Sequence, residues 1–136
     1  MKRTSIALAG MLGLLLSSAA STHHSGAMFD RTRTTTITGT VTEFSWTNPH
    51  SSFKVEVADA AGKVETWAIE MNSPNNLVRE GWKRTTLKAG DKVTVTLNPL
   101  RDGHPGGWYV AISLPDGRHL KSIEPASPAT NEPKPG

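Results

Sequence analysis

One stretch of strict alternation does most to limit the folds open to this chain. In residues 52–58 (SFKVEVA), apolar side chains occupy every second position and therefore lie on one face of a β-strand. Residues 59–62 (DAAG) are typical of a turn, and residues 63–70 (KVETWAIE) return with Trp67 and Ile69 two positions apart. These segments predict an antiparallel hairpin with one buried face.

Three further segments have strand character. Residues 35–46 (TTITGTVTEFSW) and 92–98 (KVTVTLN) are rich in Thr and Val, and residues 108–114 (WYVAISL) follow a loop rich in Gly and Pro. In the first of them the apolar positions slip by one residue between Val41 and Phe44, as a β-bulge would produce. The glycine inside the same strand suits a sharp bend.

A short helix is expected between the third and fourth strands. The dipeptide at 73–74 (SP) has the form of an N-cap followed by a first-turn proline, and Gly81 is a natural C-terminal stop. The helix can therefore have only about two turns. We expect Leu77 and Val78 to face the core and Trp82 to close it.

Three strands, a short helix and two more strands is the order of a five-stranded OB-type barrel. Residues 118–123 can add a brief sixth strand after the turn at 116–117. A closed barrel also removes the exposed sheet edges that a small β protein must otherwise protect. A β-sandwich is the alternative, but it leaves the helix unexplained. We therefore expect an all-β, OB-like barrel with one short helix between strands 3 and 4.

The N-terminal residues have the pattern of an export signal. Lys2 and Arg3 precede an uncharged apolar run at residues 6–16, which is too short to cross a bilayer core of about 30 Å. Ser18 and Ala20 supply the small residues of a cleavage site, so we expect a periplasmic protein without a membrane span after signal removal. The expected organisation is a signal peptide at 1–20, an N-terminal leader at 21–34, the barrel at 35–123 and a disordered, proline-rich tail at 124–136.

Composition and motifs disfavour several functional classes. The chain has no cysteine, and therefore no thiol nucleophile, disulfide or lipid-attachment site. It lacks the GxSxG, HExxH and phosphate-binding glycine motifs, and we expect that it is not an enzyme. Loss of Lys2 and Arg3 with the signal leaves 13 basic and 12 acidic side chains and no basic run, so we expect no nucleic-acid partner.

Several sequence motifs occur together and in order. They are HHSGAMFD, TGTVTEFSWTNPH, SPNNLVREGW, LKAGDKVTV and PLRDGHPGGWYVAISLPDGR. In these motifs the chain resembles a family of small exported bacterial proteins known as a domain of unknown function. The resemblance covers roughly residues 23–120 and implies export and a compact β domain. It implies no catalytic residue, and analogy with other OB barrels suggests binding.

The expected cleavage site creates a candidate metal site. Cleavage after Ala20 gives a mature chain that begins STH (residues 21–23), whose amine, two amide nitrogens and imidazole can surround Cu(II) or Ni(II) in a plane. Cleavage one residue later preserves this geometry with His24 in third place. The alternative is a leader that ligates nothing. The candidate metal ligands, including two loop histidines that could complete the site, are Ser21, Thr22, His23, His24, His50 and His104.

Two loops flank the usual ligand face of an OB barrel, here residues 47–51 (TNPHS) and 99–107 (PLRDGHPGG). Each contains one histidine and has a tryptophan at its edge, so we expect a glycan, an anionic small molecule or another exported protein to bind there. One alternative is that the aromatic rings only cap the barrel end. Another is a metal-free accessory protein that holds a larger exported enzyme. The candidate ligand-binding residues are Trp46, Asn48, His50, His104, Trp108 and Tyr109.

Overall fold

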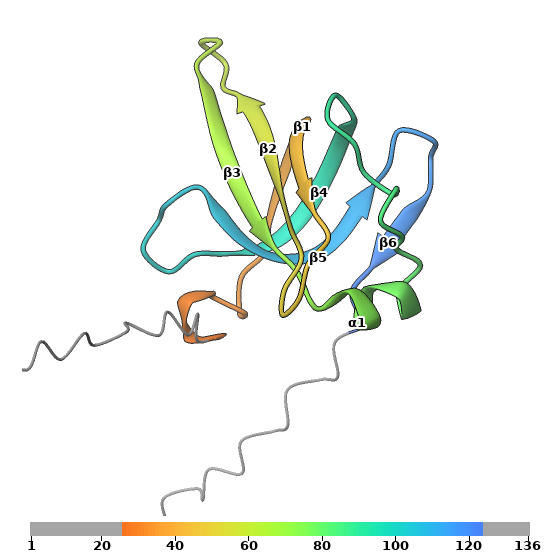
Figure 1. Cartoon of the computed structure of the whole chain (residues 1–136). Coiled ribbons are helices and arrows are strands. Elements are labelled where there is room, and N and C mark those ends of the chain that lie inside the picture. Colours follow the sequence, from red (N-terminus) through yellow and green to blue (C-terminus); the bar gives the residue numbers. More distant parts are fainter. Residues whose placement is uncertain (1–25, 124–136) are drawn as a thin grey trace, which may run out of the picture.

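The computed structural model describes residues 26–123 as a closed β-barrel (Figure 1). The strands form one sheet in the order β3-β2-β1-β4-β5-β6, and a parallel pairing of β3 with β5 closes the first five into the barrel. The helix lies between β3 and β4, which confirms the predicted OB-like architecture. The elements are η1 (Gly26–Met28), β1 (Thr35–Ser45), β2 (Ser52–Ala58), β3 (Val64–Glu70), α1 (Pro74–Arg79), β4 (Lys92–Pro99), β5 (Gly106–Ser113) and β6 (His119–Lys121).

Three of the expected segments lie outside the described residues. They are the signal peptide at 1–20, the first part of the leader at 21–25 and the proline-rich tail at 124–136. Within residues 26–123, no helix is both long enough and apolar enough to cross a membrane.

The long strand β1 pairs with β4 along its first half and with β2 along its second half. Its register with β2 shifts between Val41 and Glu43, which confirms the predicted bulge. Gly39 lies just before the bulge, and a Cβ at this position would overlap the carbonyl oxygen of Glu56 in β2. Strands β1 and β2 can therefore approach each other this closely only because residue 39 is a glycine.

Strand β5 begins at Gly106, two residues before the predicted start at Trp108. The added residues pair with the end of β3 on one side, and Gly107 pairs with Pro99 of β4 on the other. A Cβ on Gly107 would overlap the carbonyl oxygen of Asn98. Two consecutive glycines carry no alternation of side chains, which is why the sequence pattern did not reveal the closing segment.

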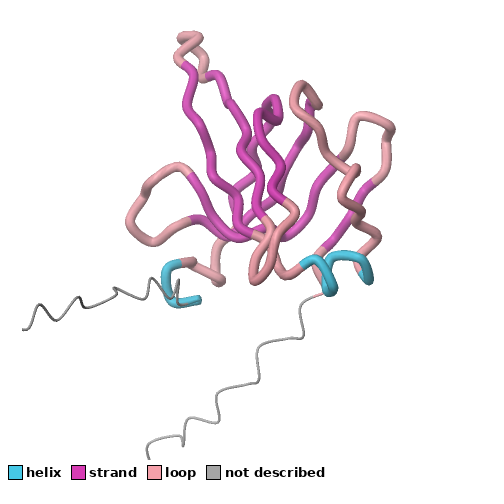
Figure 2. The backbone as a smooth tube through the Cα atoms, in the orientation of Figure 1, coloured by secondary structure: helices cyan, strands magenta, loops and turns pink. Residues whose placement is uncertain are grey.

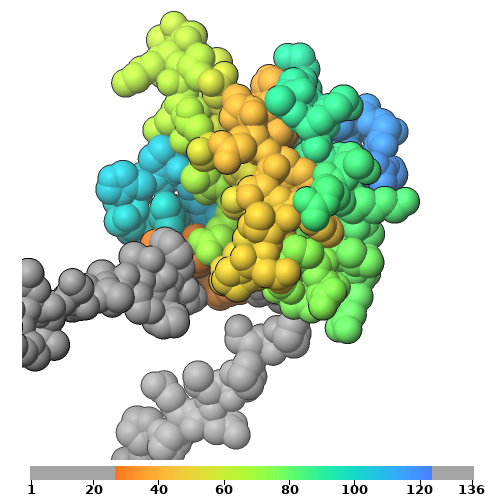
Figure 3. Space-filling view, viewed as in Figure 1, coloured from red at the N-terminus to blue at the C-terminus, as the bar shows by residue number. Residues whose placement is uncertain are grey.

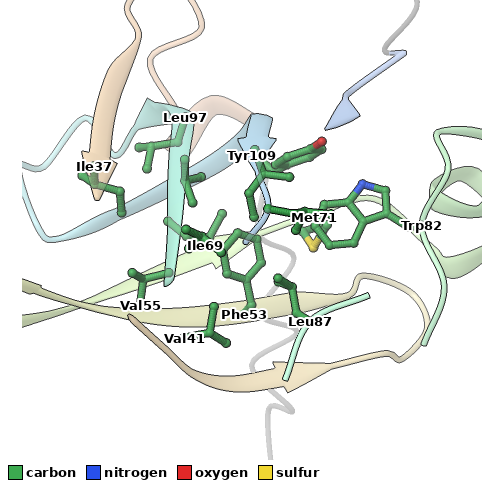
Figure 4. Packing of buried hydrophobic residues seen from close by; sticks show 14 of the residues in the cluster. Ile37, Val41, Phe53, Val55, Ile69, Met71, Trp82, Leu87, Leu97 and Tyr109 are labelled. Carbon is green, nitrogen blue, oxygen red and sulfur yellow. The ribbon is translucent and has the colours of Figure 1, made fainter. Parts of the chain in front are cut away.

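The hydrophobic core fills the barrel and extends to the end that α1 covers (Figure 4). Trp82 and Tyr109 are the largest fully buried side chains, and their rings meet edge to face with centroids 5.3 Å apart. Phe53 lies 6.3 Å from Trp82 between ring centroids. Since the chain has no disulfide, these large buried rings supply much of the apolar area that stabilises the fold.

The short helix α1 is oriented by one side chain. Leu77 is completely buried, whereas Val78 is 60% exposed, so the prediction that both face the core is wrong for Val78. Neighbouring residues of a helix point about 100° apart, and a helix of two turns can direct only one of them to the barrel. Ser73 occupies the N-cap without a side-chain cap bond, and Gly81 ends the helix with a φ of +94°.

Candidate functional site

A groove on the outside of the barrel is lined by residues of η1, of the β1–β2 loop and of the end of β3. The two helical segments, η1 and α1, lie at the same end of the molecule (Figure 2). The space-filling view shows the gold β1–β2 loop and the cyan β4–β5 loop on the same face, on either side of the yellow-green end of β3 (Figure 3). The groove between them has a volume of about 360 Å³. Its apolar and polar lining side chains include Met28, Phe29, Ile69, Leu100, His50, Ser52 and Glu70.

His50, in the β1–β2 loop, has an oriented ring at the edge of this groove. Its Nδ1 lies 3.0 Å from Oε1 of Glu70. Its ring meets Trp108 edge to face, with centroids 5.4 Å apart and an interplanar angle of 85°. Because a carboxylate can only accept a hydrogen bond, Nδ1 of His50 is the donor to Oε1 of Glu70.

Strand register explains why these three residues meet. Ser52 pairs with Glu70 in the β2–β3 hairpin, so His50, two residues before Ser52, is the diagonal neighbour of Glu70. Glu70 also pairs with Trp108 in the parallel β3–β5 contact. The same pairing that closes the barrel therefore brings the carboxylate of Glu70 and the indole of Trp108 to the same side of the barrel as the imidazole of His50.

The second half of the expected leader forms a wall of the groove. Phe29 is only 3% exposed, and its ring centroid lies 5.6 Å from that of Trp108. The amide of Arg101 donates to the carbonyl oxygen of Met28 at 2.9 Å, and the amide of Asp30 donates to Pro99 at 2.8 Å. Residues 26–30 are thus packed on the β4–β5 side of the barrel.

The outer face of β2 and β3 beside the groove is acidic. Glu56 and Lys54 point outward from β2, and Glu70 does so from β3. Glu43 of β1 joins this face through an ion pair with Lys54, with 3.0 Å between Oε2 and Nζ. The face thus carries three carboxylates and one ammonium group, and none of the outward positions of β2 and β3 is aromatic.

The candidate ligand-binding residues are only partly brought together. His50 lines the groove, and Trp108, 8% exposed, supports His50 and lies under the guanidinium group of Arg31 at 5.3 Å. Tyr109 is 2% exposed and packs on Trp82 inside the barrel, so a ligand on the surface does not contact it. The reason is alternation along β5, where adjacent side chains point to opposite faces.

The other three candidates lie away from the groove lining. Trp46 is half-buried against Phe44, with ring centroids 5.9 Å apart, and Asn48 is exposed in the β1–β2 loop. His104 is exposed, and its Nδ1 lies 3.1 Å from Oδ2 of Asp102. Hydrogen bonds from the His104 amide and ring lower the pKa of Asp102, which marks a locally ordered turn.

The candidate metal ligands fall into two parts. Residues 21–24 lie outside the described residues. Within residues 26–123, no group of three His, Asp or Glu side chains is placed to hold a metal ion. His50 and His104 have different acidic neighbours, Glu70 and Asp102. Among the described residues, His50 and His104 therefore belong to two separate pairs and not to one group of metal ligands.

Sequence reasoning missed Met28, Phe29 and Glu70 as lining residues. Glu70 resembled any other solvated strand carboxylate, although the hairpin register that places it beside His50 could be derived from the sequence. Met28 and Phe29 are an isolated apolar pair among polar and small residues, and that pair was a signal that the leader packs on the barrel.

The solved structures that resemble this fold include two OB-fold proteins. The mitochondrial single-stranded DNA-binding protein Rim1 of S. cerevisiae has a TM-score of 0.47 and 13% identity, over 60% of this chain and 92% of that one. The N-terminal domain of PriB from Thermoanaerobacter tencongensis has a TM-score of 0.43 and 22% identity, over 61% of this chain and 96% of that one.

The sequence comparisons agree with the resemblance that the motifs indicated. No curated protein matches the sequence significantly. A family described as "Family of unknown function (DUF6152)" matches residues 13–109, which is more than half of the chain. The protein therefore belongs to the family of unknown function DUF6152.

Proposed function

We propose that this protein is an exported, non-catalytic binding module and that its ligand occupies the groove beside His50. The observation that carries the proposal is the combination of an apolar wall with one oriented imidazole. Phe29 and Leu100 provide the apolar surface, and Glu70 holds the imidazole ring. A few placed polar groups on a largely apolar concave surface is the usual character of a ligand site.

The dimensions of the groove limit the ligand class. A volume of about 360 Å³ lies at the lower end of the range for small-molecule sites. It accommodates one small molecule, or one or two side chains of a partner protein. We therefore expect a ligand with a compact apolar body and a polar group that hydrogen-bonds to Nε2 of His50 or to the hydroxyl of Ser52.

The contact of the serine that follows His50 in the sequence supports a role without catalysis. A carboxylate-oriented histidine is half of a nucleophilic triad, and the other half is a hydroxyl bonded to the ring. Ser51 is fully buried and its hydroxyl donates to the carbonyl oxygen of Thr47 at 3.4 Å. Its hydroxyl is thus directed to the backbone rather than to the imidazole.

The charge on the β2–β3 face supports a ligand other than nucleic acid. Nucleic-acid sites on OB folds combine basic side chains with aromatic rings on which bases stack. Here the corresponding face carries Glu43, Glu56 and Glu70 with a single Lys54. Such a face repels a phosphate backbone and provides no stacking surface.

A pair of matched arginine substitutions tests the groove. Ala68 lines it, whereas Thr66 is exposed two residues earlier on the same outer face of β3. Immobilised wild-type, Ala68→Arg and Thr66→Arg proteins would be exposed to periplasmic extract, and retained small molecules and proteins identified by mass spectrometry. We expect Ala68→Arg to lose a component that the wild type and Thr66→Arg retain.

The result also separates the two kinds of ligand. A retained small molecule indicates a solute-binding module, and a retained protein indicates an accessory subunit that holds an exported partner. If all three proteins retain the same components, or if none retains anything, the groove is not the binding site.

A further inference from the structure

Glu70 is the acidic side chain of the groove lining. Its Oε1 accepts a hydrogen bond from Nδ1 of His50 at 3.0 Å, and its side chain is 22% exposed. A carboxylate has about four acceptor sites on its two oxygens, so one bond from an imidazole leaves most of them for other donors. The groove wall therefore contains a partly buried carboxylate that can accept hydrogen bonds from a ligand.

Ser52 adds a second polar group at the same place. Ser52 of β2 and Glu70 of β3 are directly opposite in the hairpin register, and both line the groove. Opposite side chains of an antiparallel pair have Cβ atoms about 4.5–5.5 Å apart. A ligand group with several N–H donors on one compact nitrogen, such as an ammonium group, can therefore bond to the hydroxyl and to the carboxylate together.

The charge of the neighbouring β2–β3 face favours a ligand of positive charge. Lys54, the basic side chain of this face, pairs with Glu43, with 3.0 Å between Nζ and Oε2. Glu56 is exposed two positions farther along β2 and adds another carboxylate. With Glu43, Glu56 and Glu70 against Lys54, the face is negative. Its field attracts a cation to the groove and repels an anion.

The opposite side of the groove is apolar. Phe29 and Leu100 are partners in an isolated β-bridge, and both line the groove, so their side chains belong to one wall. Ala68 lies two positions before Glu70 on the outer face of β3, where its methyl group leaves space above the strand. The groove thus combines one carboxylate end with an apolar wall.

We propose that the ligand of the groove is a small organic cation, in which an ammonium group is attached to an aromatic or branched aliphatic body. The ammonium group donates to Glu70 and Ser52, and the apolar body packs against Phe29 and Leu100. The inference rests on the proposed groove and names the chemical class of its ligand. His50 is a positioning residue, because its Nδ1–H holds the carboxylate that receives the cation.

The shape of the groove favours a small molecule over a lysine of a partner protein. A volume of about 360 Å³ is enough for a whole ring with its ammonium group. A lysine would bring its charge on a thin alkyl chain, which covers less of the apolar wall and loses more rotamer freedom when it is fixed. A compact, rigid cation fills the same space at a smaller loss of entropy.

Matched probes of similar size and different charge test the proposal. Benzylammonium, benzyl alcohol and benzoate are titrated into the full chain in solution, and the resonances of the Ala68 amide and the Trp108 indole are followed by nuclear magnetic resonance. Glu70→Gln removes the charge and keeps the size of the side chain. Glu56→Gln is the matched control, since it removes the same charge from the same face outside the groove lining. Circular dichroism checks that each variant is folded.

We expect benzylammonium to bind more tightly than benzyl alcohol, and benzoate to bind most weakly. Glu70→Gln should weaken benzylammonium about 10-fold, the lower end of the range for hydrogen bonds to charged groups, because the carboxylate is 22% exposed. The same variant should change the binding of benzyl alcohol much less, whereas a structural disturbance of the groove would weaken both probes. Glu56→Gln should weaken benzylammonium by less than about 2-fold.

The proposal is overturned if benzyl alcohol or benzoate binds as tightly as benzylammonium, if Glu70→Gln and Glu56→Gln have equal effects, or if benzylammonium leaves both resonances unchanged. Its failure is distinguishable from failure of the groove as a ligand site. The Ala68→Arg and Thr66→Arg comparison in extract detects a ligand of any charge. A neutral or anionic molecule retained there, or a protein, would keep the groove as the site and reject the small cation.

Discussion

Replacing Phe29 with alanine is the most informative single test of how the leader packs on the barrel. The ring is 3% exposed and lies 5.6 Å from Trp108 between centroids. Two backbone hydrogen bonds beside it, from Asp30 to Pro99 and from Arg101 to Met28, tie this segment to the β4–β5 side. The substitution removes the largest apolar contact of the segment and leaves its hydrogen-bonding groups in place.

The expected loss follows from the position of the ring. A buried Phe→Ala change costs about 3–5 kcal/mol, part of which comes from the cavity left behind. Phe29 lines an open groove, so water can fill the space and the cavity contribution is small. The contact with Trp108 contributes about 0.5–1.5 kcal/mol of the total. We therefore expect a decrease of about 3 kcal/mol in the free energy of unfolding, out of the 5–15 kcal/mol typical of a domain.

Urea denaturation measures the global change, and amide hydrogen exchange measures the local one. We expect the amides of Asp30 and Arg101 to lose protection from exchange in Phe29→Ala. Each of their hydrogen bonds joins the leader to the β4–β5 side of the barrel, and these two parts separate more easily without the Phe29 ring. Met28→Ala is the control, since Met28 belongs to the same segment but is 37% exposed. A loss below about 1 kcal/mol with both amides still protected would refute the view that the ring anchors the leader.

Three further outcomes test the barrel itself. Gly107→Ala should cost about 2 kcal/mol in urea denaturation, because the new Cβ overlaps the carbonyl oxygen of Asn98. Leu77→Ala should cost about 2–5 kcal/mol and Val78→Ala under about 0.5 kcal/mol by the same assay; equal effects would contradict the assigned helix face. Burial raises the pKa of Tyr109, so the unfolded chain ionises first and stability falls as pH rises above about 10. Since the chain has a single tyrosine, its tyrosinate absorbance should rise only together with unfolding.

Local patterns were sufficient to predict most of the barrel. Alternation located β2 at 52–58 as observed, and the slip in apolar phase located the bulge of β1 near Val41. These features depend on residues close together in the sequence. The early start of β5 at Gly106 depends instead on a parallel contact with β3, more than thirty residues earlier in the chain, and glycines carry no pattern that announces it.

The candidate site was predicted less well, for a related reason. The loops that border it were identified from the expected fold, and His50 was among the named residues. Its carboxylate partner was not identified, because only the register of the β2–β3 hairpin shows that Glu70 lies beside His50. Trp46 and Tyr109 were chosen for residue type and proximity to loops, but side-chain direction along each strand decides which rings face the groove.

The site and the closure of the barrel depend on the same few contacts. Glu70 pairs in register with Ser52 of β2 and with Trp108 of β5, and these two contacts bring His50, Trp108 and the carboxylate together at one end of the barrel. Substitutions that disturb the β3–β5 pairing should therefore alter the orientation of His50 even if they lie outside the groove. A side-chain change such as Glu70→Gln leaves that backbone pairing intact, which is why it can separate the function of the site from the stability of the fold.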